Sequence, residues 1–355
     1  MIVESPLQRG FCYTYPMDIQ ENVSLGPLTT FQIGGQAQFL ITVHSQEELE
    51  EAIIFAKAKS LPKLILGGGS NILVSDSGFE GVVIHIHLSG VELEEDTLIA
   101  GAGEQWDALV ERAVTEGLWG IENLSAIPGT VGGAVVQNIG AYGAALSEVL
   151  RWAEVLDTQT GDVTRYTNEQ CLFDYRNSIF KQNPDLVVLR AAFNLSREPK
   201  PNVSYKDLAA LFSSPPRLGE AGSSLNLQAI REAVIGIRKG KFPDLSIEGT
   251  AGSFFKNPIL PKAEADALKV QYPEMPLFAM PETAGVKVPL AWLLDHVLDL
   301  KGASVGGARL FEKQPLVIAA ARNTSSNDVQ ELAEKVKREV KEKLHLEIEP
   351  EVKII

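Results

Sequence analysis

Apolar and polar positions follow two different periods in the first part of the chain. Residues 37–43 (AQFLITV) and 61–66 (LPKLIL) are short apolar runs typical of strands. The stretch between them, residues 45–59, repeats apolar side chains on one helical face. It begins with Ser45 and Glu48 at the spacing of a capping box, so we expect a helix. Strands that alternate with helices indicate an α/β or α+β unit.

Residues 82–88 (VVIHIHL) alternate strictly and predict another strand. His85 and His87 fall together on the face opposite the isoleucines. Two imidazoles on one face could ligate a metal ion. No third ligand is evident, however, and the alternation of the strand explains them more simply, so the sequence predicts no metal site.

The later pattern predicts further elements. We expect helices at 106–117, at 291–300 and after Asn327, two strands within 149–167 joined by a turn at Thr160–Gly161, and strands at 186–195 and 351–355. The last helix carries an apolar stripe, formed by Val329, Leu332, Val336, Val340 and Leu344. Residues 213–224 (SSPPRLGEAGSS) are rich in Ser, Pro and Gly and predict an irregular excursion.

Two glycine-rich segments do not fit these periods. Residues 127–143 (IPGTVGGAVVQNIGAYG) hold five glycines and no charge, a composition that we expect in neither a surface linker nor a helix. GGGSN (67–71) follows a predicted strand, and its bare backbone could hold anionic oxygens, although a plain turn is the alternative. Together they suggest opposite walls of a groove for a flat, phosphorylated ligand. A dinucleotide cofactor fits, and no G-x-G-x-x-G follows a strand, so the site is outside the Rossmann class.

Three other segments contain residues that could act in catalysis. Arg176 lies in DYRNSIFK (174–181), Ser253 in GTAGSFFKNP (249–258), and Glu351 in EPEVKII (349–355). A surface arginine, a turn serine and a solvated carboxylate are equally simple interpretations. The residues by themselves leave both possibilities open.

Composition and charge limit the class of protein. A chain of 355 residues suits two or three domains. The net charge of −14 argues against a nucleic-acid or anionic-membrane partner, but local cations could still bind a small anion. Cys12 and Cys171 are isolated and predict neither a disulfide framework nor a zinc site. We see no signal peptide and no apolar run of about 18 residues, so we expect a cytoplasmic protein.

Seven motifs occur together in an order that is highly specific. They are TTFQIGG (29–35), LGGGSN (66–71), GIENLSAIPGTVGGAVVQNIGAYG (120–143), YRNSIFK (175–181), GTAGSFFKNP (249–258), WLLDHVLDLKGASVGGA (292–308) and EPEV (349–352). With them the chain resembles the UDP-N-acetylenolpyruvoylglucosamine reductase (MurB) family, type I branch, over nearly its whole length. It departs where the family often has A-G-W and an Asn, with Leu290-Ala291-Trp292 and Ala320, which we expect to affect packing rather than chemistry.

The resemblance implies an α+β fold with two parts. The first is a two-subdomain, non-Rossmann FAD-binding domain of the PCMH/vanillyl-alcohol-oxidase-like type at 28–200, split near 88–98. The second is an α+β substrate-binding domain at 201–355, whose terminal strand (346–355) returns towards the flavin, and residues 1–27 are an N-terminal extension. The resemblance further implies a monomer with non-covalent FAD and NADPH as hydride donor, reducing UDP-N-acetylglucosamine enolpyruvate to UDP-N-acetylmuramate in peptidoglycan precursor synthesis.

The resemblance also assigns residues. FAD contacts are implied for Gly67, Gly68, Gly69, Ser70, Asn71, Ile127, Pro128, Gly129, Gly132, Gly133, Asn138, Gly140, Ala141 and Gly143. Substrate contacts are implied for Tyr205, Lys241, Asn257 and Gln314, with Lys241 supplying charge for a phosphate. Catalytic roles are implied for Arg176, Ser253 and Glu351.

General chemistry suggests how the three catalytic residues divide the work. Arg176 would stabilise negative charge developing on the substrate carboxylate, and Glu351 would donate a hydrogen bond to the same oxygens. Ser253 would deliver the proton to C2 while the hydride goes to C3. Two alternatives remain open: another flavoenzyme of the same superfamily that reacts with oxygen, and a non-catalytic nucleotide-binding or scaffold protein.

Overall fold

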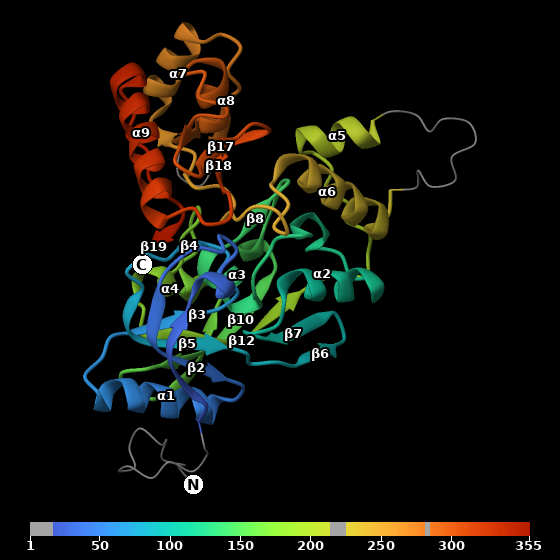
Figure 1. The fold of residues 1–355 in the computed structure, drawn as a ribbon. Coiled ribbons are helices and arrows are strands. Elements are labelled where there is room, and N and C mark those ends of the chain that lie inside the picture. Colours follow the sequence, from blue (N-terminus) through green and yellow to red (C-terminus); the bar gives the residue numbers. More distant parts are fainter. Residues whose placement is uncertain (1–16, 214–224, 281–284) are drawn as a thin grey trace. The chain divides into compact units, whose positions relative to one another are not determined.

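The computed structural model describes residues 17–213, 225–280 and 285–355 (Figure 1). These residues form two compact units. Unit 1 holds the described residues of Met1–Val23, Ala37–Gly68 and Phe79–Lys239, and unit 2 holds those of Ser24–Gln36, Gly69–Gly78 and Gly240–Ile355. No helix in the described ranges is both long and apolar enough to cross a bilayer.

The compact units divide the chain differently from the predicted domains. Residues 201–239 pack within unit 1, whereas residues 24–36 and 69–78 belong to unit 2. Pairings between distant segments cause this difference, and a periodic pattern does not reveal them. The predicted domain boundaries stay a prediction. Cys12 and the predicted excursion, apart from Ser213, lie outside the described residues.

A four-stranded sheet in the order β1-β2-β5-β3 begins unit 1. Its strands are β1 (Ile19–Ser24), β2 (Gln36–Val43), β5 (Phe79–Ile86) and β3 (Lys63–Leu66), and β5 pairs in parallel with both β2 and β3. Helix α1 (Gln46–Ala58) lies along this sheet (Figure 1) and is capped by the Ser45 side chain. The predicted strands and helix at 37–66 are therefore confirmed.

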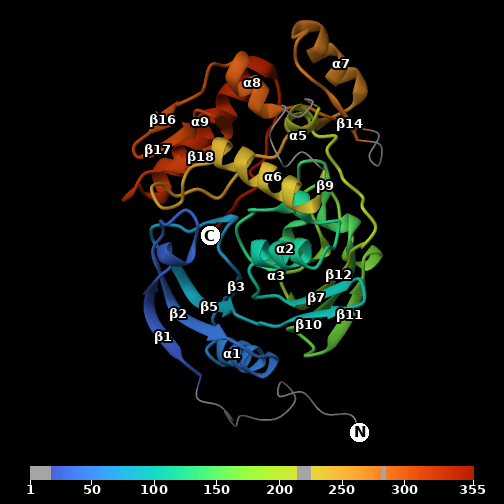
Figure 2. The same cartoon turned by 90° about the vertical axis from the view of Figure 1, so that its right-hand side faces the viewer.

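A five-stranded antiparallel sheet in the order β11-β10-β12-β7-β6 forms the rest of the unit 1 framework. Its strands are β6 (Val91–Glu94), β7 (Thr97–Gly101), β10 (Leu150–Asp157), β11 (Val163–Thr167) and β12 (Leu186–Asn194). Helices α2 (Trp106–Thr115) and α3 (Val131–Gln137) lie beside β7 and β12 (Figure 2), and α4 (Ile179–Gln182) is a short turn. Trp106 and Phe193 are fully buried between these elements, which confirms the predicted helix at 106–117.

The prediction that residues 127–143 contain no helix is wrong. Helix α3 occupies the centre of this stretch, and the Thr130 side chain accepts from the Gly133 N–H at its start. Gly132 lets the helix approach the end of β7, because a Cβ added there would lie 2.9 Å from the Ala102 Cβ. Two short strands follow, β8 (Gly140–Ala141) and β9 (Ala144–Ala145). The glycines therefore serve close packing as well as loops.

Helices α5 (Lys206–Phe212) and α6 (Leu227–Lys241) complete unit 1. Leu208, Ile230 and Val234 are fully buried in a small apolar cluster with Trp119 and Tyr142. This burial explains why residues that follow position 200 pack with the preceding sheets.

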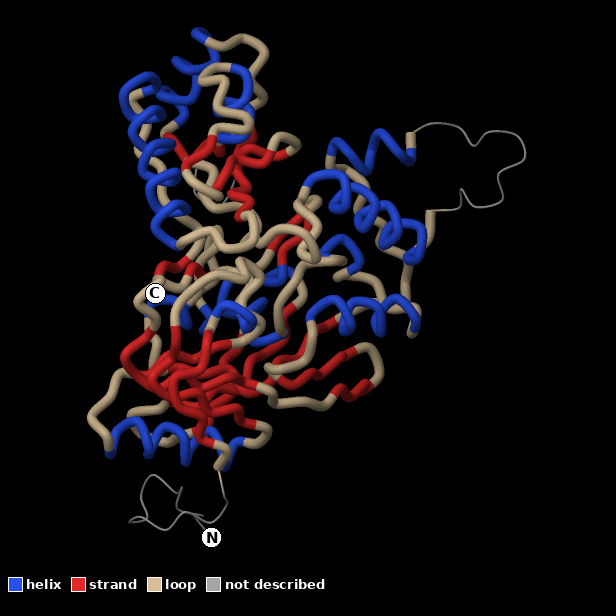
Figure 3. Tube along the Cα trace, in the orientation of Figure 1, coloured by secondary structure: helices blue, strands red, loops and turns tan. Residues whose placement is uncertain are grey.

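The described residues of unit 2 form three small sheets and three α-helices. The strands are β16 (Ser304–Val305), β17 (Ala308–Phe311) and β18 (Gln314–Ala320); β13 (Ile259–Leu260), β15 (Gly285–Lys287) and β14 (Phe278–Met280); and the parallel pair β4 (Ile72–Leu73) and β19 (Lys353–Ile354). Helix α8 (Leu290–His296) packs against β18, α9 (Ser326–Leu344) packs against β16 and β17, and α7 (Lys262–Gln271) lies beside β15 (Figure 3).

Two predicted helices of unit 2 have different outcomes. The predicted stripe of α9 is buried, and Ser325 and Asp328 form a complete capping box at its start. The predicted helix at 291–300 is too long, because α8 ends at His296 and Asp299 adopts a left-handed conformation with φ 49°. A side-chain pattern alone does not show where the backbone turns.

Candidate active site

The two glycine-rich segments meet in unit 1. Strand β3 ends at Leu66, and a Cβ added at Gly68 would lie 2.7 Å from the Gly129 Cα. A Cβ at Gly67 would lie 2.5 Å from the Thr130 Oγ1. Side chains at either position would therefore separate the loops. This contact explains the bare backbone of both segments, and closely approaching glycine backbone is the kind of surface that can bind a pyrophosphate.

Arg176 is attached to the same glycine-rich stretch. Its guanidinium donates to the carbonyl oxygens of Asn138, at 3.4 Å, and of Gly140. The Asn138 amide in turn donates to the Asp174 carbonyl at 3.0 Å, and Asn138 ends α3 in a left-handed conformation. The predicted catalytic arginine is thus fixed beside predicted FAD-binding residues, and it is not a loose surface side chain.

Tyr205 also lies against this stretch. Its ring meets the Tyr142 ring edge to face, with centroids 5.3 Å apart, and remains 40% exposed. The Asn202 amide donates to the Gly143 carbonyl at 2.8 Å, and Asn123 donates to the carbonyls of both Tyr142 and Asn202. Hence the segment before α5 is positioned by the end of the glycine-rich stretch.

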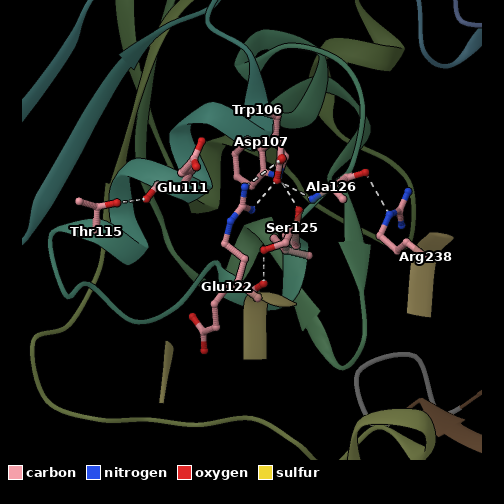
Figure 4. A network of polar contacts seen from close by, with 10 residues as sticks. Trp106, Asp107, Glu111, Thr115, Glu122, Ser125, Ala126 and Arg238 are labelled. Carbon is pink, nitrogen blue, oxygen red and sulfur yellow. Dashed lines mark hydrogen bonds and ion pairs between the residues drawn. The ribbon is translucent and has the colours of Figure 1, made fainter. Parts of the chain in front are cut away.

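A polar network fixes the beginning of the stretch (Figure 4). Asp107 on α2 accepts two hydrogen bonds from Arg231, at 2.6 and 3.0 Å, and one from the Ala126 N–H at 2.6 Å. Arg238 Nε donates to the Ala126 carbonyl at 3.0 Å. Burial by itself raises the pKa of Asp107, but its hydrogen bonds and the two arginines lower the pKa overall. Helices α2 and α6 therefore hold the residue before Ile127 from two sides.

Ser253 is positioned in unit 2 by strand β18. It pairs with Val317 through an antiparallel bridge, and the next N–H, of Phe254, donates to the Leu316 carbonyl at 2.7 Å. Gly252 precedes it with φ 76°, a conformation that glycine adopts readily. Phe254 and Phe255 are fully buried and pack edge to face, whereas Ser253 is half-buried. The serine thus stands at the margin of a rigid apolar core.

Glu351 is brought to the same segment of unit 2. Its N–H donates to the Phe254 carbonyl at 2.8 Å, and its own carbonyl accepts from the Asn71 amide at 3.2 Å. The pairing of β4 with β19 continues this arrangement, because the Lys353 N–H donates to the Asn71 carbonyl at 3.1 Å. Two of the three predicted catalytic residues are therefore neighbours in the fold of unit 2.

Three of the predicted substrate-binding residues belong to unit 2. Asn257 accepts a hydrogen bond from the Leu290 N–H, at the start of α8. Gln314 begins β18, three residues before the bridge partner of Ser253. Lys241 is the last residue of α6. Their contacts with substrate stay predictions.

The predicted FAD-binding residues are divided between the units. Gly67, Gly68 and the residues of 127–143 belong to unit 1, whereas Gly69, Ser70 and Asn71 belong to unit 2. Gly69 has φ 58°, and a Cβ there would lie 2.1 Å from the Leu28 carbonyl oxygen. These individual contacts with FAD stay predictions.

Sequence reasoning missed Thr130 and Tyr142. Thr130 lies between the two glycine loops and caps α3. A Thr three residues before Gly133, ahead of an apolar run, is the available signal for such a cap. The role of Tyr142 as the partner of Tyr205 has no comparable local signal, because the contact joins distant segments.

The loops of unit 1 fit an FAD pyrophosphate, because the space that a Cβ at Gly67 or Gly68 would fill is lined by the Thr130 hydroxyl and by the Gly129 backbone. Across the part of the chain that the structure describes, no group of three or more His, Cys, Asp or Glu side chains is arranged to hold a metal ion. Cys171 is a buried free thiol, and burial raises its pKa to about 12.

Known proteins match both halves of the chain. A model of the FAD binding domain matches residues 37–167, and the model described as the C-terminal domain of UDP-N-acetylenolpyruvoylglucosamine reductase matches residues 244–355. The UDP-N-acetylenolpyruvoylglucosamine reductase of Amoebophilus asiaticus (strain 5a2) is 40% identical over 348 residues, which cover 96% of this chain and 100% of that protein. The reductase of the same name from Escherichia coli (strain K12) is 37% identical over 341 residues, with 94% and 96% covered.

A solved structure is also similar over nearly the full length. The crystal structure of UDP-N-acetylenolpyruvylglucosamine reductase (MurB) from Thermus caldophilus superposes with a TM-score of 0.68 and 27% identity. The match covers 95% of this chain and 99% of that one. Neither unit is therefore left out of the similarity.

Proposed function

Because the chain belongs to the UDP-N-acetylenolpyruvoylglucosamine reductase family, we propose that it uses NADPH to reduce UDP-N-acetylglucosamine enolpyruvate to UDP-N-acetylmuramate, a precursor of peptidoglycan. The chain is an FAD-dependent oxidoreductase with an α+β fold. The full-length match to relatives with this name is the observation that carries the proposal. The substrate is accordingly a UDP-sugar.

The cofactor is held by backbone rather than by side chains. We assign its pyrophosphate to the loops that meet at Gly68 and Gly129, where a Cβ would displace the neighbouring chain. When bound, FAD supplies the redox chemistry, since it can accept a hydride from NADPH and pass it to the enolpyruvyl group. The protein binds and orients the cofactor and the substrate, stabilises the charge that develops and delivers a proton.

Arg176 is positioned to stabilise negative charge on the substrate. Two backbone carbonyls, of Asn138 and Gly140, fix its guanidinium at the glycine-rich stretch. Hydride addition at C3 of the enolpyruvyl group places negative charge on the adjacent carboxylate. A cation that is already oriented stabilises such charge without further reorganisation, which lowers the barrier. We assign this role to Arg176.

Ser253 and Glu351 complete the reaction. Reduction needs one proton at C2. We assign its delivery to the hydroxyl of Ser253, whose backbone pairs with Val317 next to the buried Phe254 and Phe255. Glu351 is held by Phe254 and Asn71 through its main chain, and we assign its carboxyl group a hydrogen bond to the substrate carboxylate. Tyr205, Lys241, Asn257 and Gln314 are proposed to bind the UDP-sugar.

An anaerobic absorbance experiment tests this function. The purified protein should be yellow, and NADPH should bleach its flavin. Addition of UDP-N-acetylglucosamine enolpyruvate should then restore the colour with stoichiometric formation of UDP-N-acetylmuramate. An oxidase would regain its colour with oxygen and not with this substrate, and a non-catalytic nucleotide-binding protein would not be bleached at all. Either result would contradict the proposal.

A further inference from the structure

Three histidines cluster in unit 1, at the carboxyl ends of two parallel strands. His85 and His87 lie on one face of β5 and just beyond it, and their Nε2 atoms are 3.3 Å apart. His44 follows β2, and its ring centroid lies 5.5 Å from that of His87. His87 and His44 are exposed, and His85 is half-buried. These side chains are not among the predicted cofactor-binding, substrate-binding or catalytic residues.

The distance between the two Nε2 atoms suits a shared metal ion. Zinc binds imidazole nitrogen at about 2.0–2.1 Å with tetrahedral geometry, so two nitrogens on one ion are separated by about 3.3–3.4 Å. Alternate residues on a strand point to the same side, which places both imidazoles towards one point in space. The pair therefore has the separation of two ligands without rearrangement of the backbone.

The surroundings of His85 are those of a metal ligand. The His85 ring forms a hydrogen bond with the Gly67 backbone. With Nε2 directed at His87, Nδ1 is the nitrogen left for Gly67. A ligating histidine characteristically donates its other N–H to a carbonyl or carboxylate, which fixes the ring and its tautomer.

We propose that His85 and His87 form a two-histidine chelate for a divalent transition-metal ion of the zinc, nickel and copper class. Imidazole is a preferred ligand of these ions. Without the ion, the Nε2 of one ring donates to the other; with it, both Nε2 atoms offer lone pairs and His87 carries its proton on Nδ1. Water completes the coordination, and the acidic chain, with its net charge of −14, favours cations.

Calorimetric titration of tag-free holoprotein with Zn²⁺ tests the site. The protein is first stripped with a chelator that is then removed. We expect about one Zn²⁺ per chain, and at least about 10-fold weaker binding for His87→Gln and His85→Gln. His296→Gln is the matched control, because His296 is an exposed histidine of unit 2, and it should bind like the unaltered protein.

A spectroscopic experiment identifies the ligands independently of any substitution. Electron paramagnetic resonance of the Cu²⁺-loaded holoprotein should show coupling to two imidazole nitrogens, and to one fewer in His87→Gln. Absence of Zn²⁺ binding, unchanged affinity in His87→Gln, or an equal loss in His296→Gln would overturn the proposal. So would a Cu²⁺ spectrum without imidazole nitrogen. Thermal melting of each variant shows that the exposed positions 87 and 296 tolerate the change.

Discussion

The N–H of Glu351 donates to the carbonyl of Phe254, the residue that follows Ser253, at a distance of 2.8 Å. Together with the bond that the Lys256 N–H donates to the Glu349 carbonyl at 3.0 Å, this main-chain bond joins the last segment of the chain to the GSFF core of unit 2. The side chains of Ser253 and Glu351 are consequently carried by paired backbone, so each can be changed without removing the bond that positions the other.

Gly68→Ala should weaken FAD binding. The added Cβ would lie 2.7 Å from the Gly129 Cα, so one of the two loops must move. Overpacking of this kind costs about 1–3 kcal/mol, or roughly 5- to 150-fold in affinity if the cost falls on binding. Gly236→Ala is the control, since a Cβ there meets nothing within 4 Å and α6 should gain slightly. Fluorescence titration with FAD measures both; equal affinities would remove the loop contact from the cofactor site.

Arg176→Lys should slow transfer from reduced flavin to substrate by roughly 10²-fold, while flavin reduction by NADPH changes little. Lysine keeps the charge but lacks the planar fork that Arg176 uses to hold two carbonyls. Rapid-mixing absorbance separates the two half-reactions. Arg165→Lys, at an exposed position beside Trp152, should affect neither. If both half-reactions of Arg176→Lys fall equally, the arginine only supports the fold.

Tyr205→Phe should raise the Kd for substrate by up to about 10-fold and leave FAD in place, because one hydroxyl hydrogen bond is lost. Phenylalanine keeps the edge-to-face contact with Tyr142, so the ring should stay in position. Substrate titration of the oxidised enzyme measures the effect. Tyr166→Phe, in a ring contact with Phe180, serves as control. Unaltered affinity would exclude the Tyr205 hydroxyl from substrate binding.

Asp185→Asn should destabilise unit 1 near neutral pH and less in acid. The Lys63 ammonium, 2.5 Å away, lowers the pKa of Asp185 to about 2, and the unfolded value is about 3.9. A lowered pKa adds stability above the unfolded value, and this contribution is lost as the pH falls from about 4 towards 2. The difference in melting temperature between wild type and variant should therefore shrink over that window. A constant difference would show that the ion pair contributes nothing.

Much of the framework was predictable because it depends on local periodicity. The strand containing His85, the cap at Ser45 and the stripe on α9 follow from alternation, capping chemistry and helical spacing. Helix α3 was not predictable in this way. Its Gly132 is required by a neighbour, Ala102, that no local pattern identifies.

In the candidate site, too, the motifs could be read from the sequence, whereas the contacts between distant segments could not. Each catalytic residue could be chosen by its resemblance to the family's motifs, which keep their residue types and order. The contacts of Arg176 with Asn138, of Tyr205 with Tyr142 and of Glu351 with Phe254 join distant segments. Such pairings depend on the whole fold, so only the structure could reveal them.

The reoxidation rate of reduced Ser253→Ala tests the central claim most directly. The variant is reduced anaerobically with NADPH, freed of nucleotide and mixed rapidly with UDP-N-acetylglucosamine enolpyruvate while flavin absorbance is followed. Because alanine has no proton to give to C2, we predict reoxidation roughly 10²–10⁴-fold slower than wild type, with nearly normal reduction by NADPH. Ser253→Cys should recover part of the rate. Reoxidation of Ser253→Ala at the wild-type rate would show that Ser253 is only a turn residue and would contradict the account.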